Sequence, residues 1–315
     1  MAEVIKVRAG WTPAITVALT LVAGASGCTP GSRSGPAEAP ATNSASPRTS
    51  TRPAEKPAPG DHRLFLDWDG KERTYEVHAP PAYQPGHALP LVVVMHYRDG
   101  TPATMREMTR FDSKADTEGF LVAYPVGLNG AVNALICCGG NDDVGFIRAM
   151  VEHLTTAWGA DRKRVYATGI SNGADMSFRM AIEAPGMFSA IAPVSGGFLG
   201  TKAGTDPAYK PGRPVSVMSF AGASDELRGR IEDGLHAWYQ KLGCTAGAAA
   251  WIDPGRTVSR TVAGCADGSQ VISHVISGMG HAWPGGTNAG LGDPTAQINA
   301  VDTMWAFFQA HSSSS

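Results

Sequence analysis

From residue 61 onward, short apolar runs alternate with segments in which apolar residues recur at helical spacing. The run over 89–95 is apolar at every position, as in a strand that is buried on both faces of a sheet. The predicted strands are 89–95, 120–125, 164–169, 190–194, 215–220 and 273–277. The predicted helices are 143–158, 175–184, 231–241 and 300–311. This alternation predicts an α/β domain with a mostly parallel central sheet and helices on both faces.

A hairpin at the edge of the sheet is predicted before these elements, over 61–79. Two strand-like runs flank the pair Asp69-Gly70, and Asp-Gly between such runs is a strong signal for a tight turn. The folded domain is therefore predicted to begin at residue 61 and to span 61–315.

The first 28 residues have the pattern of an export signal. Lys6 and Arg8 precede an apolar stretch over 11–25, which is too short for a good membrane span but suits the apolar region of a signal peptide. The small residues before Cys28 resemble the lipobox of bacterial lipoproteins, in which the cysteine is lipidated and becomes the first residue. Ala25 stands where a lipobox usually has Leu. Simple cleavage of a secretory signal is therefore the alternative to a lipid anchor on Cys28.

Residues 29–60 consist mainly of Pro, Ser, Thr, Ala and Gly, without large apolar side chains. Such a segment cannot bury enough apolar surface to offset the entropy of ordering, so it is expected to be a flexible tether. We therefore expect an exported protein. It is either a cell-envelope lipoprotein held at the membrane through Cys28 or a secreted protein.

Charge and composition exclude two classes of protein. The 26 Lys and Arg against 28 Asp and Glu give a formal net charge of −2, which lacks the basic character of a nucleic-acid-binding protein. Hydrophobic residues make up 43% of the chain, too many for a wholly disordered protein. A length of 315 residues permits a large domain with a substantial core.

Cysteine usage also favours export. With Cys28 set aside, four cysteines remain, and outside the cytoplasm these tend to oxidise. Cys244 and Cys265 lie 21 residues apart in a polar, Gly-rich stretch and are candidates for one disulfide. Cys137 and Cys138 are candidates for a disulfide between adjacent residues, with two free thiols as the alternative. The spacing does not suit a zinc site, and the three pairings of four cysteines stay open.

The strongest chemical signal is the motif Gly-Ile-Ser-Asn-Gly over residues 169–173, between a predicted strand and a predicted helix. That context is typical of a nucleophile elbow, a sharp turn that lifts the serine oxygen clear of the sheet at the positive end of the following helix. A plain strand–helix turn is the alternative. Ser171 is therefore the candidate nucleophile, and a serine hydroxyl needs a base.

The candidate acid and base follow the serine in the order that this type of site uses, acid first and histidine second. His281 lies in a loop directly after the last predicted strand and is the candidate base. The other histidines after the serine fall in a helix, in a strand and at the C-terminus, at positions 236, 274 and 311. Asp225 lies just past the strand 215–220 and is the candidate acid, which would orient the imidazole and stabilise imidazolium. The rival aspartates, at 206, 233, 253 and 267, follow no strand as cleanly.

An oxyanion hole needs backbone N–H groups aimed at the developing charge. One is expected from Asn172, next after the serine, and the other from Tyr97 in the loop after the strand 89–95. His96 and Trp283 are candidates for the substrate pocket, and loop shaping or packing is the alternative for both.

The domain resembles the secreted esterases grouped with polyhydroxybutyrate depolymerases, feruloyl esterases and related actinobacterial lipoproteins. The resemblance covers about 61–311 and is carried by the segments 91–96, 120–125, 137–139, 142–147, 169–173 and 278–286. It implies an α/β-hydrolase fold with the triad on Ser171, Asp225 and His281. Two positions depart from the family pattern: Tyr97 replaces a Gly, and Ala221 replaces a His before Gly222.

Together these features predict an exported serine hydrolase of carboxylic esters that acts through an acyl-enzyme. We expect it to need no metal or organic cofactor, to take a small or oligomeric ester and to be a monomer. One alternative is a non-catalytic envelope binding protein on a hydrolase scaffold, which the Tyr97 departure favours. The other is a hydrolase of thioester or peptide bonds, which the same triad permits.

Overall fold

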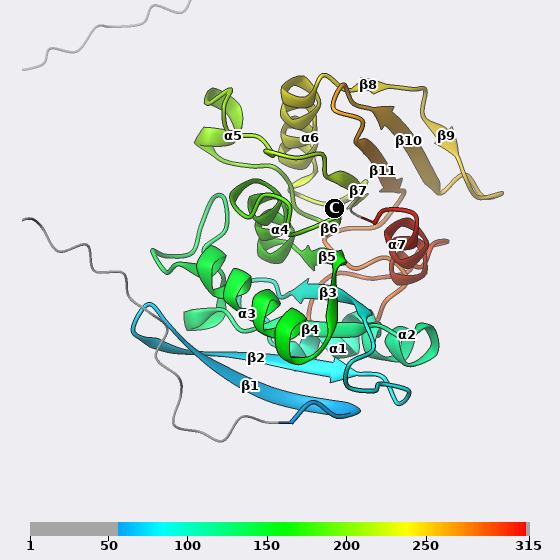
Figure 1. The fold of residues 1–315 in the computed structure, drawn as a ribbon. Coiled ribbons are helices and arrows are strands. Elements are labelled where there is room, and N and C mark those ends of the chain that lie inside the picture. The colour runs from blue at the N-terminus through cyan, green and yellow to red at the C-terminus, as the bar shows by residue number, and fades with distance from the viewer. Residues whose placement is uncertain (1–55, 313–315) are drawn as a thin grey trace, which may run out of the picture. The chain divides into compact units, whose positions relative to one another are not determined.

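The computed structural model describes residues 56–312, which all lie in one compact unit (Figure 1). The predicted signal peptide 1–28 with Cys28, and the tether up to residue 55, lie outside the described residues and stay predictions. Among the helices of residues 56–312, none combines the length and the apolar character needed to cross a membrane.

In the described part of the chain, eleven strands form one mixed sheet in the order β1-β2-β4-β3-β5-β6-β7-β11-β10-β8, with β9 paired to β10. The strands are β1 (Gly60–Trp68), β2 (Lys71–Ala79), β3 (Leu89–Met95), β4 (Leu121–Pro125), β5 (Ala160–Ile170), β6 (Ala190–Val194), β7 (Ser216–Gly222), β8 (Thr245–Ala246), β9 (Ala250–Trp251), β10 (Val258–Gly264) and β11 (Gln270–Ile276). Neighbours from β4 through β11 in this order pair in parallel. Antiparallel pairs complete the two edges. The predicted mostly parallel sheet is confirmed.

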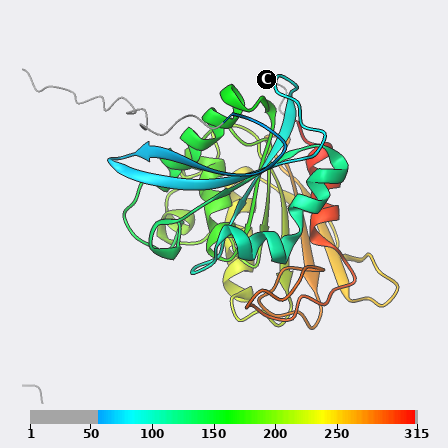
Figure 2. The ribbon, with the colours of Figure 1, turned by 90° about the horizontal axis from the view of Figure 1, so that it is seen from below.

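Helices cover both faces of the sheet, as Figure 2 shows from a second side. They are α1 (Pro102–Thr109), α2 (Phe111–Glu118), α3 (Asp143–Ala157), α4 (Asn172–Glu183), α5 (Thr201–Thr205), α6 (Arg228–Leu242) and α7 (Ala300–Gln309), with a short 3-10 turn η1 (Leu128–Gly130). Buried side chains of α3, α4 and α6 form the core on one face. Those of α1, α2 and α7 form the core on the other.

The central strand β3 contributes to both cores. Leu91 and Val93 face the core that contains α3 and α4, whereas Val92 and Val94 face the core that contains α2 and α7. Successive side chains of a strand point to opposite faces. A strand between two helix layers is therefore apolar at every position, which explains the continuous apolar run in the sequence.

The predicted edge hairpin is present as β1 and β2, with Asp69 and Gly70 at its turn and both in the left-handed region (φ 53° and 71°). The structure also contains elements that the sequence pattern does not predict: α1, α2 and the antiparallel strands β8, β9 and β10 beyond β11. The fold class stands: the added strands extend the sheet at the β11 end, and α1 and α2 add to the helices on one face.

Two disulfides are present, and both join the cysteines expected. Cys137 is bonded to Cys138, and Cys244 to Cys265. Gly243, in the left-handed region at φ 61°, ends α6 directly before Cys244. Cys265 begins the turn between β10 and β11, so the longer bridge ties α6 to that hairpin.

Candidate active site

Ser171 lies in a strained turn between the end of β5 and the start of α4. Its φ of 57° and ψ of −118° are unusual for a residue with a side chain. The turn is held from both sides: the Ser171 amide donates to the Val194 carbonyl at 3.0 Å, and the Ser171 carbonyl accepts from the Ala174 and Asp175 amides, each at 3.0 Å. This is the local geometry that the G-x-S-x-G motif predicts.

The two glycines of the motif are required by the close approach of β3. A Cβ on Gly169 would lie 2.6 Å from the Met95 carbonyl oxygen, and a Cβ on Gly173 would collide with the same oxygen. The end of β3 therefore passes directly against the turn. Since His96 and Tyr97 follow Met95 directly, this approach places their loop beside Ser171.

Asp225 and His281 meet at the same edge of the sheet. Asp225 follows β7, His281 follows β11, and His281 Nδ1 lies 3.0 Å from Asp225 Oδ2. Strands β5, β6, β7 and β11 are parallel neighbours, so the loops after all four gather where Ser171 lies. Gly222 permits the approach, because a Cβ there would collide with the carbonyl oxygens of Met279 and Gly280.

The Asp225 carboxylate is fully buried but well supplied with donors. Oδ1 accepts from the Leu227 amide at 2.9 Å. Burial alone would raise the pKa of Asp225, but hydrogen bonds from His281 and the Leu227 amide bring it below its usual value. The carboxylate is therefore ionised at neutral pH and accepts the Nδ1 proton of His281, which leaves Nε2 as the basic nitrogen.

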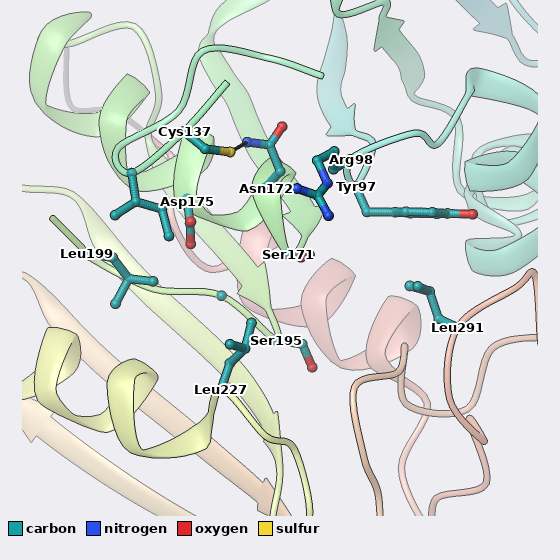
Figure 3. A pocket seen from close by; sticks show the side chains of 12 residues that line it. Tyr97, Arg98, Cys137, Ser171, Asn172, Asp175, Ser195, Leu199, Leu227 and Leu291 are labelled. Carbon is teal, nitrogen blue, oxygen red and sulfur yellow. Dashed lines mark hydrogen bonds between the residues drawn. The ribbon is translucent and has the colours of Figure 1, made fainter. Parts of the chain in front are cut away.

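A pocket of about 320 Å³ opens beside Ser171 (Figure 3). Its apolar walls come from four aliphatic side chains: Ile136, Leu199, Leu227 and Leu291. Its polar lining includes Ser171, Asn172, Asp175 and Ser195. The Ser171 hydroxyl forms no hydrogen bond within residues 56–312, so it is free to meet a ligand.

Asn172 and Tyr97 both line this pocket. Within the described residues, neither backbone amide has a hydrogen-bond partner, as an oxyanion hole requires before substrate binds. The Tyr97 hydroxyl donates to the Ala289 carbonyl at 2.9 Å, which anchors the ring that replaces the family's glycine. The Asn172 side chain bonds Val132 in both directions at 3.1 Å and donates to Cys137 Sγ at 3.3 Å.

His96 and Trp283 belong to the scaffold, and their assignment to the pocket needs correction. Each is about 1% exposed, and neither lines the pocket. His96 Nε2 accepts from the Gly127 amide at 2.9 Å, and Nδ1 donates to the Tyr97 carbonyl at 2.7 Å. Burial lowers the pKa of His96, so the imidazole is neutral and shapes the Tyr97 loop. Trp283 packs edge-on against Phe111 in the core.

Two polar residues of the pocket, Ser195 and Asp175, were not predicted from the sequence. Ser195 directly follows β6, is buried and has a φ of 47°, and its hydroxyl donates to the Ala282 carbonyl at 3.4 Å. Asp175, on the first turn of α4, is 4% exposed and accepts from the Gly197 amide at 2.8 Å. Burial raises the pKa of Asp175 to about 7. The one available signal for Asp175 was a charged residue four positions after the serine, on the same helix face.

The described residues hold one group with the geometry of metal ligands, formed by Asp61, His78 and Asp112. Arg106 already pairs with both carboxylates: Nη1 lies 2.8 Å from Asp61 Oδ1 and also bonds Asp112. None of these side chains lines the pocket. The group is an ion-pair network that fastens the edge hairpin to α1 and α2.

Comparison with known proteins places this chain among esterases. Residues 74–210 match the family described as esterase PHB depolymerase. The protein named "Putative esterase NocK" from Nocardia uniformis subsp. tsuyamanensis is 31% identical over 280 residues, which are 76% of this chain and 79% of that protein. Feruloyl esterase B from Neurospora crassa is 28% identical over 62% of this chain and 78% of that protein. The solved acetyl xylan esterase from Aspergillus awamori shares the fold, with a TM-score of 0.58 at 19% identity over 78% of this chain and 99% of that one.

Proposed function

The chain belongs to the esterase PHB depolymerase family and is a carboxylic ester hydrolase, and on this premise we propose an exported serine esterase whose triad is Ser171, His281 and Asp225. The observation that carries the proposal is the Asp225–His281 pair, 3.0 Å apart, at the sheet edge where the strained turn presents Ser171. The related feruloyl esterase supports a substrate that is a small or oligomeric carboxylic ester.

In the proposed mechanism, Ser171 Oγ attacks the ester carbonyl carbon while His281 Nε2 takes the hydroxyl proton. Asp225 holds the imidazole and stabilises imidazolium. The tetrahedral intermediate collapses when His281 returns the proton to the leaving alkoxide, and the acyl group stays on Ser171. Water then repeats the sequence, with His281 first as base and then as acid, and releases the carboxylic acid.

The oxyanion of each tetrahedral intermediate is assigned to the amides of Asn172 and Tyr97, the two unpartnered donors beside Ser171. The start of α4 adds the positive end of a helix dipole. Loss of one such donor typically lowers the rate by about 10²- to 10³-fold. Because the oxyanion is bound by the backbone N–H of residue 97, the replacement of the family's glycine by Tyr97 leaves this hydrogen-bond donor in place.

Export is supported by the two disulfides, because structural disulfides persist in oxidising compartments and are rare in the cytoplasm. The signal sequence, the lipobox-like Cys28 and the flexible tether complete this part of the proposal. Metabolic labelling with a palmitate analogue should mark the full chain and leave Cys28→Ser unlabelled. Label on both would remove Cys28 as the lipid site.

The serine esterase assignment is tested with p-nitrophenyl esters of graded acyl length and the full chain. Hydrolysis and reaction with a fluorophosphonate probe are expected for the wild type, and both are expected to vanish in Ser171→Ala. Undiminished hydrolysis in Ser171→Ala would overturn the proposed triad. A parallel panel of thioester and amide substrates reports whether the same serine cleaves other acyl bonds.

A further inference from the structure

The pocket beside Ser171 contains one carboxyl group that the triad does not use. Asp175 lies one helical turn after the nucleophile, since its amide donates to the Ser171 carbonyl at 3.0 Å. Oδ1 accepts from the Gly197 amide at 2.8 Å. Within the described residues, Oδ2 has no hydrogen-bond partner, and the side chain lines the pocket (Figure 3). A carboxyl group that is 4% exposed thus turns an unsatisfied oxygen toward the space where substrate binds.

The surroundings of Asp175 do not satisfy that oxygen. Besides the Gly197 amide, the charges that act on Asp175 are those of Arg230 on α6 and of His281. Among residues 56–312, no ion pair involves Asp175. Leu199 and Ile136 form aliphatic walls of the same pocket. Oδ2 is not among the fully enclosed polar atoms that lack a partner, and Asp175 lines the pocket. A ligand group that enters the pocket can therefore form a hydrogen bond with Oδ2.

The charges around the pocket favour a neutral polar partner over a cation. Arg98 lines the pocket and is largely exposed, and the charge of Arg230 on α6 also acts on Asp175. Both repel an ammonium group. A hydroxyl suits both protonation states of the carboxyl group, because it donates to a carboxylate and accepts from a carboxylic acid.

We propose that Asp175 is a specificity-determining residue that binds a hydroxyl group of the ester substrate close to the scissile bond. The inference rests on the proposed function, since it assumes that Ser171 holds the reacting carbonyl. The one-turn spacing places the Asp175 side chain on the same helix face as the nucleophile. The hydroxyl is therefore carried by the part of the acyl or alcohol group nearest the ester.

The test compares esters that differ by one group, OH against CH₃, in the same shape. Ethyl 3-hydroxybutanoate is paired with ethyl 3-methylbutanoate for the acyl side. For the alcohol side, 2-hydroxyethyl butanoate is paired with propyl butanoate. The ratio of kcat/KM within a pair is measured by pH-stat with the full chain. Hydrogen bonds to charged groups predict a ratio on the order of 10- to 100-fold in favour of the hydroxyl in one pair.

Two variants separate recognition from a structural role. Asp175→Leu is expected to bring the ratio to about one. Asp175→Asn keeps an acceptor for the Gly197 amide, so it should fold and keep part of the preference. Asp69→Asn, an equal charge change at the exposed hairpin turn, is the matched control and should keep the wild-type ratio.

The pH profile gives a readout that a purely structural role would not move. Burial raises the pKa of Asp175 to about 7, and the carboxylate is the stronger acceptor. The preference for the hydroxyl ester should therefore rise from pH 6 to pH 8 in the wild type and stay flat in Asp175→Asn. Effects of pH on the steps that both esters of a pair share cancel in the ratio.

A wild-type ratio near one in both pairs, or a ratio that Asp175→Leu leaves unchanged, would overturn the inference. These outcomes are distinct from failure of the proposed function, which shows as hydrolysis of the methyl-bearing esters that persists in Ser171→Ala.

Discussion

The two glycines beside Ser171 are required because they have no side chain, and not because they allow unusual backbone angles. Neither Gly169 nor Gly173 has a positive φ, yet a Cβ at either position would press on the Met95 carbonyl. We predict that Gly169→Ala lowers kcat/KM at least tenfold and destabilises the protein by about 1–3 kcal/mol, because overpacking must push β3 away from Ser171. Steady-state kinetics and urea unfolding measure the two effects.

The matched control is Gly204→Ala on α5, where a Cβ would meet nothing within 4 Å. It should keep activity and stability. Wild-type activity in Gly169→Ala would mean that the Tyr97 loop does not depend on this contact.

In the proposed triad, the buried Asp225 carboxylate fixes the imidazole of His281. In Asp225→Asn, an amide in its place favours the wrong tautomer, so we expect kcat/KM for p-nitrophenyl butyrate to fall by roughly 10⁴-fold. The exposed Asp233→Asn on α6 has the same charge change and should retain activity. A loss smaller than tenfold in Asp225→Asn would assign the orienting role to another group.

Residues that lie in a recognisable local motif could be predicted from the sequence. Residues whose place in the pocket depends on contacts between distant parts of the chain could not. Ser171 has flanking glycines, and His281 and Asp225 each follow an apolar run. Asp175 and Ser195 carry no such sign, because they become pocket residues only when the loop after β6 folds over α4. His96 was misplaced for the same reason: its neighbour Gly127 lies 31 positions away in the chain.

At the scale of elements, the two disulfides should have separable effects. Cys244–Cys265 closes a long loop between α6 and the β10–β11 hairpin, away from the pocket residues. Loop-closure entropy predicts that Cys244→Ala/Cys265→Ala lowers the free energy of unfolding by about 3 kcal/mol. Activity per folded molecule should not change. Urea unfolding followed by tryptophan fluorescence, with kinetics below the transition, tests both statements.

The disulfide between Cys137 and Cys138 closes almost no loop, so it gains little from chain entropy. Its position matters instead, because Cys137 lines the pocket and accepts from Asn172 Nδ2 at 3.3 Å. We predict that Cys137→Ser/Cys138→Ser lowers kcat/KM about tenfold or more while stability changes by less than about 1 kcal/mol. A stability loss without a kinetic change would contradict this assignment.

Short or half-exposed helices and strands were not predicted, because they have too few buried apolar residues to show a helical or strand periodicity. Helix α1 has eight residues, with Met105 and Met108 as its large buried side chains. In the outer strand β10, only Val258 and Ala263 are buried. The central strands and long helices, which bury nearly every inward position, were predicted within a few residues. Burial rather than intrinsic propensity made them visible.

Across the whole molecule, buried titratable groups link stability to pH in opposite directions. Burial lowers the pKa of His274 to about 4, so this residue stabilises the protein above its unfolded pKa near 6.5 and loses that contribution as pH falls. Burial raises the pKa of Asp175 to about 7, so its burial costs stability as pH rises. The two trends oppose each other between pH 5 and 7, and the wild-type curve alone cannot separate them.

A variant comparison isolates the histidine. His274 is 2% exposed and stacks on Phe220 with ring centroids 4.7 Å apart, so His274→Phe keeps the packing and removes the titration. From pH 7 to pH 5, the wild type should lose about 2 kcal/mol more stability than His274→Phe, because it must take up a proton on unfolding. Urea unfolding at both pH values measures this difference. The exposed His87→Gln should follow the wild type, and equal pH responses of the wild type and His274→Phe would show that burial at position 274 does not control acid stability.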